Sequence, residues 1–479
     1  MLILWIIPAV AVLFLLYIFI RAARFVPAKE AGAAAPLPVE ADEKALGEHL
    51  GEMLRRKTVS YAEEGLADQA QFDSFRALLK ELYPNVFKRF ECERIGHNGL
   101  LLRLAGQGKA EPSVLMAHYD VVPADQAEWS VPAFEGLIRD GEVWGRGAVD
   151  TKCTVLGIME AAEGLAREGF IPKGDLYISL GGDEECLGTD ASAIVDALKL
   201  RGVRPGFVLD EGGAVVENVF PGVAKPAALI GIAEKGSVFL DITAAGKSGH
   251  ASAPPAKQAV GVLADALRRI VNKPMPFTLT GPALELFDTL GRHSTFLYRI
   301  IFANLNIFAP VLDLICRKSG GELNALVRTT AALTRLSAAD AYNVLPNVAR
   351  AGINLRLIPG DTIADAAGRI EKAIGDAQVK VEVRNGSEPS KVSLTGGEPW
   401  ERLKAAIRQT YPEAIVSPYL MVAASDSRHF CRVSDHVYRF SGMPLSREQR
   451  GMIHGKDERV PLKLLPDLTR FYVRVMRQC

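Results

Sequence analysis

The sequence has no excess of charge of either sign. Lys and Arg together number 56, Asp and Glu together also number 56, and no long run of one sign appears. Proteins that bind nucleic acid usually carry a basic patch or stripe that neutralises phosphates. We therefore expect no nucleic-acid partner, and the composition favours a small substrate of neutral or mixed charge.

Cysteines are few, and their spacing forms no motif. They include no CxxC pair and no regular framework, and they stand at Cys92, Cys153, Cys186, Cys316, Cys431 and Cys479. Such usage does not indicate an oxidising compartment and fits reduced thiols better. Cys153 and Cys186 neighbour the acidic motifs described below, and we expect both to be packed thiols rather than metal ligands.

Charged residues are absent from the first twenty positions, Met1 to Ile20. An apolar stretch of this length spans a bilayer as a helix. A cleaved signal peptide is the alternative, but no Lys or Arg precedes the stretch, and it exceeds the usual ~7 to 15 apolar residues. We expect residues 1–22 to be a single-pass membrane anchor. Arg21, Arg24 and Lys29 follow the span and only weakly favour a cytoplasmic body, so the side of the membrane stays open.

The rest of the chain has the composition of a water-soluble protein, with 48% apolar and 23% charged residues. Since single hydrophobic cores rarely grow beyond ~250 to 300 residues, a chain of 479 residues is expected to form at least two domains. Residues 23–40 are rich in Ala and Pro and are typical of a linker.

Two further units follow from the pattern of apolar runs. Residues 41–232 alternate short apolar runs with helical stretches, which predicts an α/β sandwich, and 387–479 are expected to return to it. Residues 233–386 are expected to form a smaller inserted α+β module. Its unusually apolar stretch from Phe287 to Ile315 is predicted to be helical and partly buried, in a dimer interface, against a membrane or as an ordinary pair of core helices.

Polar side chains follow the predicted strands of the first unit. His118-Tyr119-Asp120 comes after an apolar run, and three acidic loops follow it along the chain. The acidic residues of those loops are Asp150, Asp183, Glu184, Glu185, Asp210 and Glu211. Adjacent acids repel one another unless cations compensate, and together with a late His454 they supply the nitrogen and oxygen ligands that Zn²⁺ accepts in open catalytic sites.

The order of the motifs HYDVVP, GRGAVDTK, GDEE, LDEGG, GKSGHASAPP and IHGKDE resembles the M20 metallopeptidase family over nearly all of residues 41–479. The HYDVVP form, the apolar insertion and the SDSRHF segment look most like its carboxypeptidase S and N-fatty-acyl-amino-acid hydrolase branch. The resemblance implies a two-zinc exopeptidase-like sandwich with an inserted ferredoxin-like dimerisation or lid domain. The sequence departs from the family pattern at Cys153 and Ala191, where glycine is common.

The resemblance also implies roles for individual residues. It gives His118, Asp150 and Asp210 to one zinc ion and Asp150, Glu185 and His454 to the other, with Co²⁺ or Mn²⁺ as possible replacements. Asp150 would bridge the two ions. Glu184 would be the general base, and Asp120 would orient His118 without binding a metal ion itself.

Substrate contacts are implied at four more positions. His250 would polarise the scissile carbonyl, in many relatives from the partner subunit of a homodimer. Asn343 and Arg356 match substrate-binding positions, since a guanidinium holds a carboxylate in a fork, and Arg428 is a weaker candidate whose alternative is a surface salt bridge.

The expected function is hydrolysis of an amide or peptide bond next to a free carboxylate, in an N-acyl amino acid or a short peptide. One alternative is a dizinc aminopeptidase or dipeptidase, which would bind a substrate amine through acids instead of through Arg356. Another is a non-catalytic, membrane-bound dimeric binding protein. Such a protein would have little reason to retain Glu184 together with the full set of proposed ligands.

Overall fold

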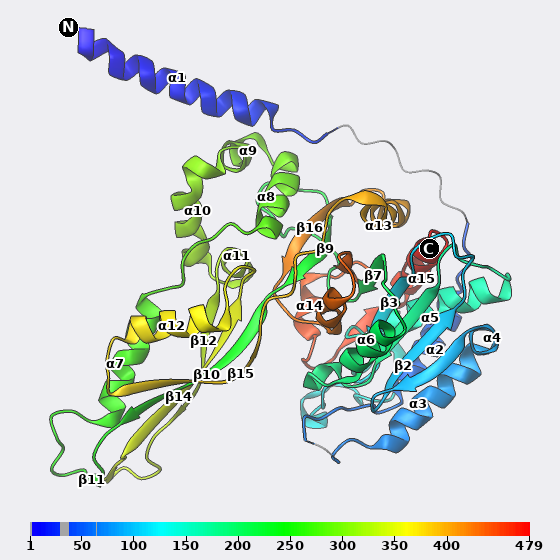
Figure 1. The fold of residues 1–479 in the computed structure, drawn as a ribbon, viewed down its shortest axis with the longest axis horizontal. Helices are drawn as coiled ribbons and strands as arrows, with labels where there is room; N and C mark the ends of the chain where they lie inside the picture. Colours follow the sequence, from blue (N-terminus) through cyan, green and yellow to red (C-terminus); the bar gives the residue numbers. More distant parts are fainter. Residues whose placement is uncertain (1, 29–37, 64) are drawn as a thin grey trace.

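The computed structural model describes residues 2–28, 38–63 and 65–479. Figure 1 shows an N-terminal helix, a larger α/β body and an elongated module that extends away from that body. The predicted linker, residues 23–40, lies partly outside the described residues, because 29–37 are not among them.

The larger body is built on a nine-stranded mixed sheet in the order β1-β2-β6-β3-β7-β17-β9-β16, with β8 beside β9. Its strands are β1 (Glu91–Ile95), β2 (Gly99–Leu104), β3 (Ser113–His118), β6 (Leu176–Gly181), β7 (Phe207–Asp210), β8 (Val215–Val216), β9 (Ala227–Glu234), β16 (Ile415–Met421) and β17 (Val437–Arg439). The central strands β6, β3 and β7 are parallel, and every residue in them is buried. This burial on both faces explains why they appear in the sequence as continuous apolar runs.

Helices cover both faces of this sheet. Alternate side chains of β3 point in opposite directions, so Leu115 packs into one core and Met116 into another. The first core also contains α2 (Glu43–Leu54), α3 (Gln69–Leu82), α4 (Pro84–Arg89), α5 (Lys152–Arg167), α13 (Gly397–Thr410) and α15 (Leu465–Met476). The second contains α6 (Asp190–Leu200). The predicted α/β sandwich is confirmed.

The elongated module is a four-stranded antiparallel sheet in the order β12-β14-β10-β15. It consists of β10 (Gly236–Ala245), α7 (Ala259–Asn272), β12 (Thr330–Ser337), β14 (Val348–Leu357), α12 (Ile363–Ile374) and β15 (Val379–Ser387). Apolar residues of α7 and α12 pack on the sheet in a core of its own. The βαββαβ succession with this strand order is the ferredoxin-like arrangement. A small ladder of β11 (Gly249–His250) and β13 (Val344–Leu345) lies at its far end.

The apolar stretch between α7 and β12 forms helices, as predicted. They are α8 (Gly281–His293), α9 (Phe296–Phe302), α10 (Leu305–Ser319) and α11 (Gly321–Leu326). Helix α8 packs on β16 and β9 of the larger sheet, where Phe287 stacks on Phe302 and both contact Phe220. The inner faces of these helices therefore belong to the larger body rather than to the sheet of the inserted module.

The N-terminal helix α1 (Leu2–Arg24) is largely exposed. Among the described residues, Trp5–Arg24 is the one helix that is long and apolar enough by itself to cross a membrane. A signal sequence at the same place would have the same properties. Helices α9 and α10 pass the same test only when taken together, and they meet at an angle of 105°.

Candidate metal centre

The predicted ligands meet at one edge of the larger sheet. β3 ends in His118, β6 ends just before the GDEE acids, and β7 ends in Asp210. Because these strands are adjacent and parallel, their carboxyl ends lie at the same edge. His454 arrives from the C-terminal part of the chain, since β18 (Arg459–Pro461) pairs with β5 (Glu142–Trp144), the strand that precedes the Asp150 loop.

Asp150 lies between two histidines. Its Oδ1 atom is 3.0 Å from Nε2 of His118, and its Oδ2 atom is 3.3 Å from Nε2 of His454. Nε2 of His454 is also 2.8 Å from Oε2 of Glu185. Each oxygen of Asp150 thus faces a different histidine.

The residues of this centre fit a divalent cation. Ligand atoms of His118, Asp150 and Glu185 lie within 4.8 Å of one another, and the buried Oε1 atom of Glu185 has no hydrogen-bond partner. Burial raises the pKa values of Glu184 and Glu211 well above their usual range, and neighbouring carboxylates add to the effect. So many acids around two histidines need positive charge to stay ionised together.

Asp120 connects two of the loops. Its carboxylate accepts the backbone N–H groups of Glu184 and Glu185 at 3.2 and 3.1 Å, and the Ser60 hydroxyl at 2.7 Å. Nδ1 of His118 lies 3.1 Å from the backbone oxygen of Asp120 and 3.4 Å from its carboxylate. With its proton on Nδ1, the imidazole has a free lone pair on Nε2 that can bind a cation. Asp120 therefore has the position of an orienting residue.

Asp210 is buried, but it is not part of the group formed by His118, Asp150 and Glu185. Its two oxygens accept the backbone N–H groups of Glu211 at 2.9 Å and Ser427 at 3.0 Å. Asp426, from the SDSRHF segment, is buried nearby, and its Oδ1 atom has no hydrogen-bond partner. Glu211 was predicted only as one of the acidic loop residues, and no role was predicted for Asp426.

Glu458 is a further residue that the sequence reasoning missed. Its fully buried carboxylate accepts the backbone N–H groups of Gly147, Val149 and Asp150 at 3.0, 2.7 and 3.0 Å. The Arg146 guanidinium donates to it at 2.8 Å. These contacts fix the loop that presents Asp150. The signal in the sequence was its position in IHGKDE, four residues after His454.

Glu458→Gln is expected to weaken metal binding by about 10- to 100-fold, the usual cost of losing a residue that orients a metal ligand. The amide keeps the shape of the side chain, but half of its terminus donates rather than accepts, so one of the backbone N–H groups loses its partner. Metal affinity measured by competition with a chelator tests this. Glu448→Gln, at an exposed acid near the same segment, is the matched control and should leave the affinity unchanged.

The predicted substrate residues fall into two groups. His250 and Asn343 lie together at the far end of the inserted module, where the Asn343 carbonyl accepts the N–H of Ala251 at 3.1 Å. Arg356 is at the opposite end of β14, paired with Ser237 and Thr330. Within one chain, the structure therefore does not bring His250 or Asn343 to the metal centre (Figure 1).

Arg428 lies beside the metal centre. Its guanidinium donates to the backbone oxygen of Ser425 at 3.0 Å and opposes the rise that burial causes in the pKa of Asp426. Its role in substrate binding stays a prediction. The weakest of the sequence candidates thus lies close to one of the buried acids of the centre.

A family model and two relatives each match most of this chain. Residues 114–478 match the model of peptidase family M20/M25/M40. The chain is 37% identical to the N-fatty-acyl-amino acid synthase/hydrolase PM20D1 of Xenopus tropicalis over 91% of this chain and 86% of that protein. It is 34% identical to a probable carboxypeptidase S-like 2 of Dictyostelium discoideum over 90% of this chain and 84% of that protein.

Solved structures share the fold. An M20 family metallo-carboxypeptidase from Sulfolobus solfataricus superposes with a TM-score of 0.67 at 15% identity, covering 92% of this chain and 99% of that one. Human carnosine dipeptidase 1 gives a TM-score of 0.63 at 14% identity, covering 91% of this chain and 96% of the other. At these identities the likeness concerns the fold alone.

Proposed function

This chain belongs to peptidase family M20/M25/M40 and is an enzyme of that kind, and from this we propose that it hydrolyses the amide bond of N-fatty-acyl amino acids. The residues His118, Asp150, Glu185, Asp210 and His454 would hold two Zn²⁺ ions, or Co²⁺ or Mn²⁺ in their place. When bound, such ions activate water for attack and stabilise negative charge that develops on the carbonyl oxygen.

The observation that carries the fatty-acyl assignment is a largely apolar cavity of about 290 Å³ beside the metal centre. Gly212 and Gly213 line it directly after Asp210 and Glu211, and Ile453 lines it directly before His454. The remaining wall is mainly aliphatic and includes Val216, Val219, Leu229, Leu286, Leu290, Leu323, Leu326 and Leu445. Transfer of an acyl chain from water into this cavity is favourable, whereas transfer of a polar dipeptide side chain is not.

Glu184 has the properties of a general base. Burial raises the pKa of its carboxyl well above the usual range, so it binds a proton more readily than an ordinary glutamate. In the proposed reaction it accepts the proton of the attacking water and delivers it to the leaving amine. Arg428 is proposed to bind the carboxylate of the amino acid.

His250 is proposed to act from a second copy of the chain. It is exposed at the far end of the inserted module, apart from the metal centre of its own chain (Figure 1). A homodimer in which each inserted module reaches the partner's larger body would bring His250 and Asn343 to the substrate. Arg356, at the base of the module, is proposed to contact the substrate from there.

Activity toward a panel of substrates tests this function. Purified full-length protein supplied with Zn²⁺ or Co²⁺ should hydrolyse N-acyl amino acids with a kcat/KM that rises with acyl length, and should act poorly on dipeptides. Val219→Phe fills the apolar cavity and should lower kcat/KM for long acyl chains by about 10-fold or more while sparing N-acetyl substrates.

The control for that variant is Val260→Phe, at a half-exposed valine on α7 outside the cavity. It should leave the dependence on acyl length unchanged. A kcat/KM for dipeptides that exceeds the kcat/KM for N-acyl amino acids of every chain length would indicate the dipeptidase alternative. The absence of product from every substrate, in both wild type and Glu184→Gln, would contradict a hydrolase altogether.

A further inference from the structure

The outer faces of α9 and α10 carry large apolar side chains that are half or more exposed, or nearly so. Leu297 is 71% exposed on α9, and Val311, Leu314 and Ile315 are 48%, 53% and 41% exposed on α10. Leu314 and Ile315 follow Val311 by three and four residues, so both lie on the same side of the helix as Val311. Exposed apolar surface of this kind marks an interaction site.

Helix α1 lies against α9. The rings of Phe19 and Phe296 stack with centroids 6.2 Å apart, and Asn304 donates from Nδ2 to the backbone oxygen of Ile18 at 3.3 Å. Ile18 and Ala22 are buried by this contact, although most of α1 is exposed. The apolar surface of α1 is therefore continuous with that of α9.

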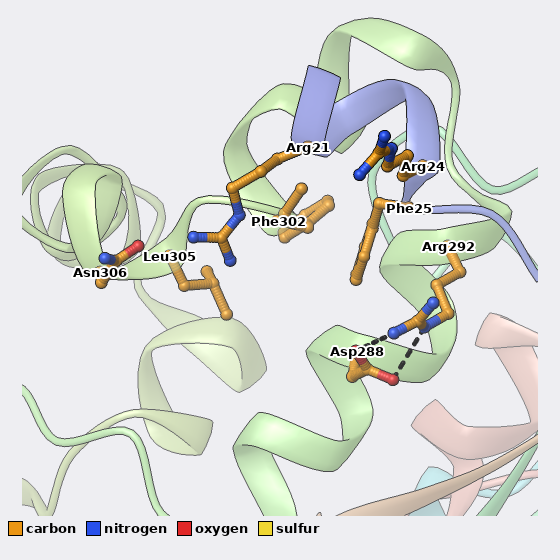
Figure 2. A pocket seen from close by; sticks show the side chains of 9 residues that line it. Arg21, Arg24, Phe25, Asp288, Arg292, Phe302, Leu305 and Asn306 are labelled. Carbon is orange, nitrogen blue, oxygen red and sulfur yellow. Dashed lines mark hydrogen bonds and ion pairs between the residues drawn. The ribbon is translucent and has the colours of Figure 1, made fainter. Parts of the chain in front are cut away.

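A basic cavity of about 520 Å³ lies where α1 ends (Figure 2). Arg21 and Arg24 border it from the last turn of α1, and Arg292 borders it from α8. Arg292 is neutralised by Asp288, to which it donates two hydrogen bonds of 2.9 and 2.8 Å. Arg21 donates to the Tyr17 hydroxyl, and within the described part of the chain neither Arg21 nor Arg24 pairs with a carboxylate.

The surroundings of this cavity are apolar. Figure 2 shows Phe25 and Phe302 between the arginines, with Leu305 below Arg21. The Arg292 guanidinium also lies 4.5 Å from the centroid of the Phe25 ring. The cavity thus combines two unneutralised guanidinium groups with an apolar rim. Lipid phosphate, which sits next to hydrocarbon, has the matching character.

We propose that α9 and α10 lie in the interfacial layer of a bilayer beside α1, and that the cavity of Arg21 and Arg24 binds the phosphate of an anionic lipid. The bend of 105° between α9 and α10 suits helices that lie at the surface rather than crossing it. The two arginines stand at the end of the apolar span, at the depth where headgroups begin. Positive charge on the last turn of α1 complements an anionic headgroup.

This placement has a consequence for substrate entry. Helix α8 lies beneath α9, and its Leu286 and Leu290 line the apolar cavity next to the metal centre. An acyl chain dissolved in the bilayer would reach that cavity along α8. This consequence rests on the proposed function, whereas the docking of α9 and α10 does not.

Depth measurements test the docking. Full-length protein carrying Cys92→Ser, Cys186→Ser and Cys431→Ser, which removes the exposed and the partly exposed native thiols, is spin-labelled at Leu314→Cys or at Ile171→Cys and reconstituted into lipid nanodiscs. Both positions are 53% exposed, but Ile171 lies on the larger body away from α10. The label at 314 should be more accessible to oxygen than to a water-soluble nickel chelate, and the label at 171 should show the reverse.

Two results would overturn the docking. A label at 314 with the accessibility of the label at 171 would place α10 in water. A label at 314 that is inaccessible to both reagents would show that a second copy of the chain covers this face instead of lipid. Neither result depends on hydrolysis, so the docking and the proposed function fail independently.

Native mass spectrometry of protein released from nanodiscs tests the headgroup site. With equal amounts of phosphatidylglycerol and phosphatidylcholine, wild type should retain the anionic lipid with about 5-fold preference or more. Arg21→Gln/Arg24→Gln should lose that preference, while Arg268→Gln, at an exposed arginine on α7, should keep it. Equal retention by all three proteins would contradict the site. Loss of lipid in inorganic phosphate, but not in sodium chloride of equal ionic strength, would show a free-phosphate site instead.

Discussion

Glu184→Gln is expected to lower kcat by about 10²- to 10⁴-fold, the range associated with loss of a general base. The amide occupies the same volume but cannot accept the proton of the attacking water. Bound metal, measured by elemental analysis, should stay at the wild-type level because Glu184 is not a proposed ligand. Glu185→Gln is the matched comparison at the neighbouring position and should lower the metal content as well as the rate.

The same variant tests whether the site is shared between subunits. In a dimer where His250 serves the partner, Glu184→Gln protein mixed with His250→Ala protein forms mixed dimers with one intact site. With free subunit exchange in an equal mixture, activity should reach about a quarter of that of wild type at the same total protein concentration. Activity no greater than the sum of the separate variants, under conditions where exchange is demonstrated, would show that each site is complete within one chain.

Asp150→Asn is expected to abolish activity and to reduce bound metal to one ion per chain or fewer. Each oxygen of Asp150 faces a different histidine, at 3.0 and 3.3 Å, so replacing one oxygen by an amide nitrogen would remove the ligand atom of one of the two proposed ions. Chelation of wild-type protein should have the same effect and should be reversed by Zn²⁺ or Co²⁺. Full activity after exhaustive chelation would contradict a metal-dependent reaction.

Removal of metal should also change how stability depends on pH. Burial raises the pKa values of Glu184 and Glu211, and contacts with Asp150 and Glu185 raise the pKa of His454 to about 10. Groups whose pKa is higher in the folded state bind more protons there, so the metal-free protein should lose stability as pH rises from 6 to 9. Melting temperatures measured across that range should fall without metal, and added Zn²⁺ should reduce or reverse the fall.

The sequence pattern indicated several of the proposed ligands because their setting is local. His118, Glu185 and Asp210 lie at or a few residues after buried strands, and the apolar runs that predict those strands are continuous because both faces are covered. Because β6, β3 and β7 are adjacent and parallel, the loops that follow them lie at the same edge of the sheet. The role of Asp150 between two histidines and the ferredoxin-like module were implied by motif order, and the observed distances and strand order agree with them.

The sequence alone also determined the apolar N-terminal helix and the helical character of the stretch from Phe287 to Ile315, because both depend on composition and local periodicity. Only the tertiary structure decided which distant segments meet. It joined α1 to α9, separated His250 from the metal centre of its own chain and placed Arg428 rather than Arg356 beside the acids. It also showed that Glu458 holds the Asp150 loop through three backbone N–H groups. Such contacts join residues far apart in the chain, and no spacing or periodicity in a single sequence encodes them.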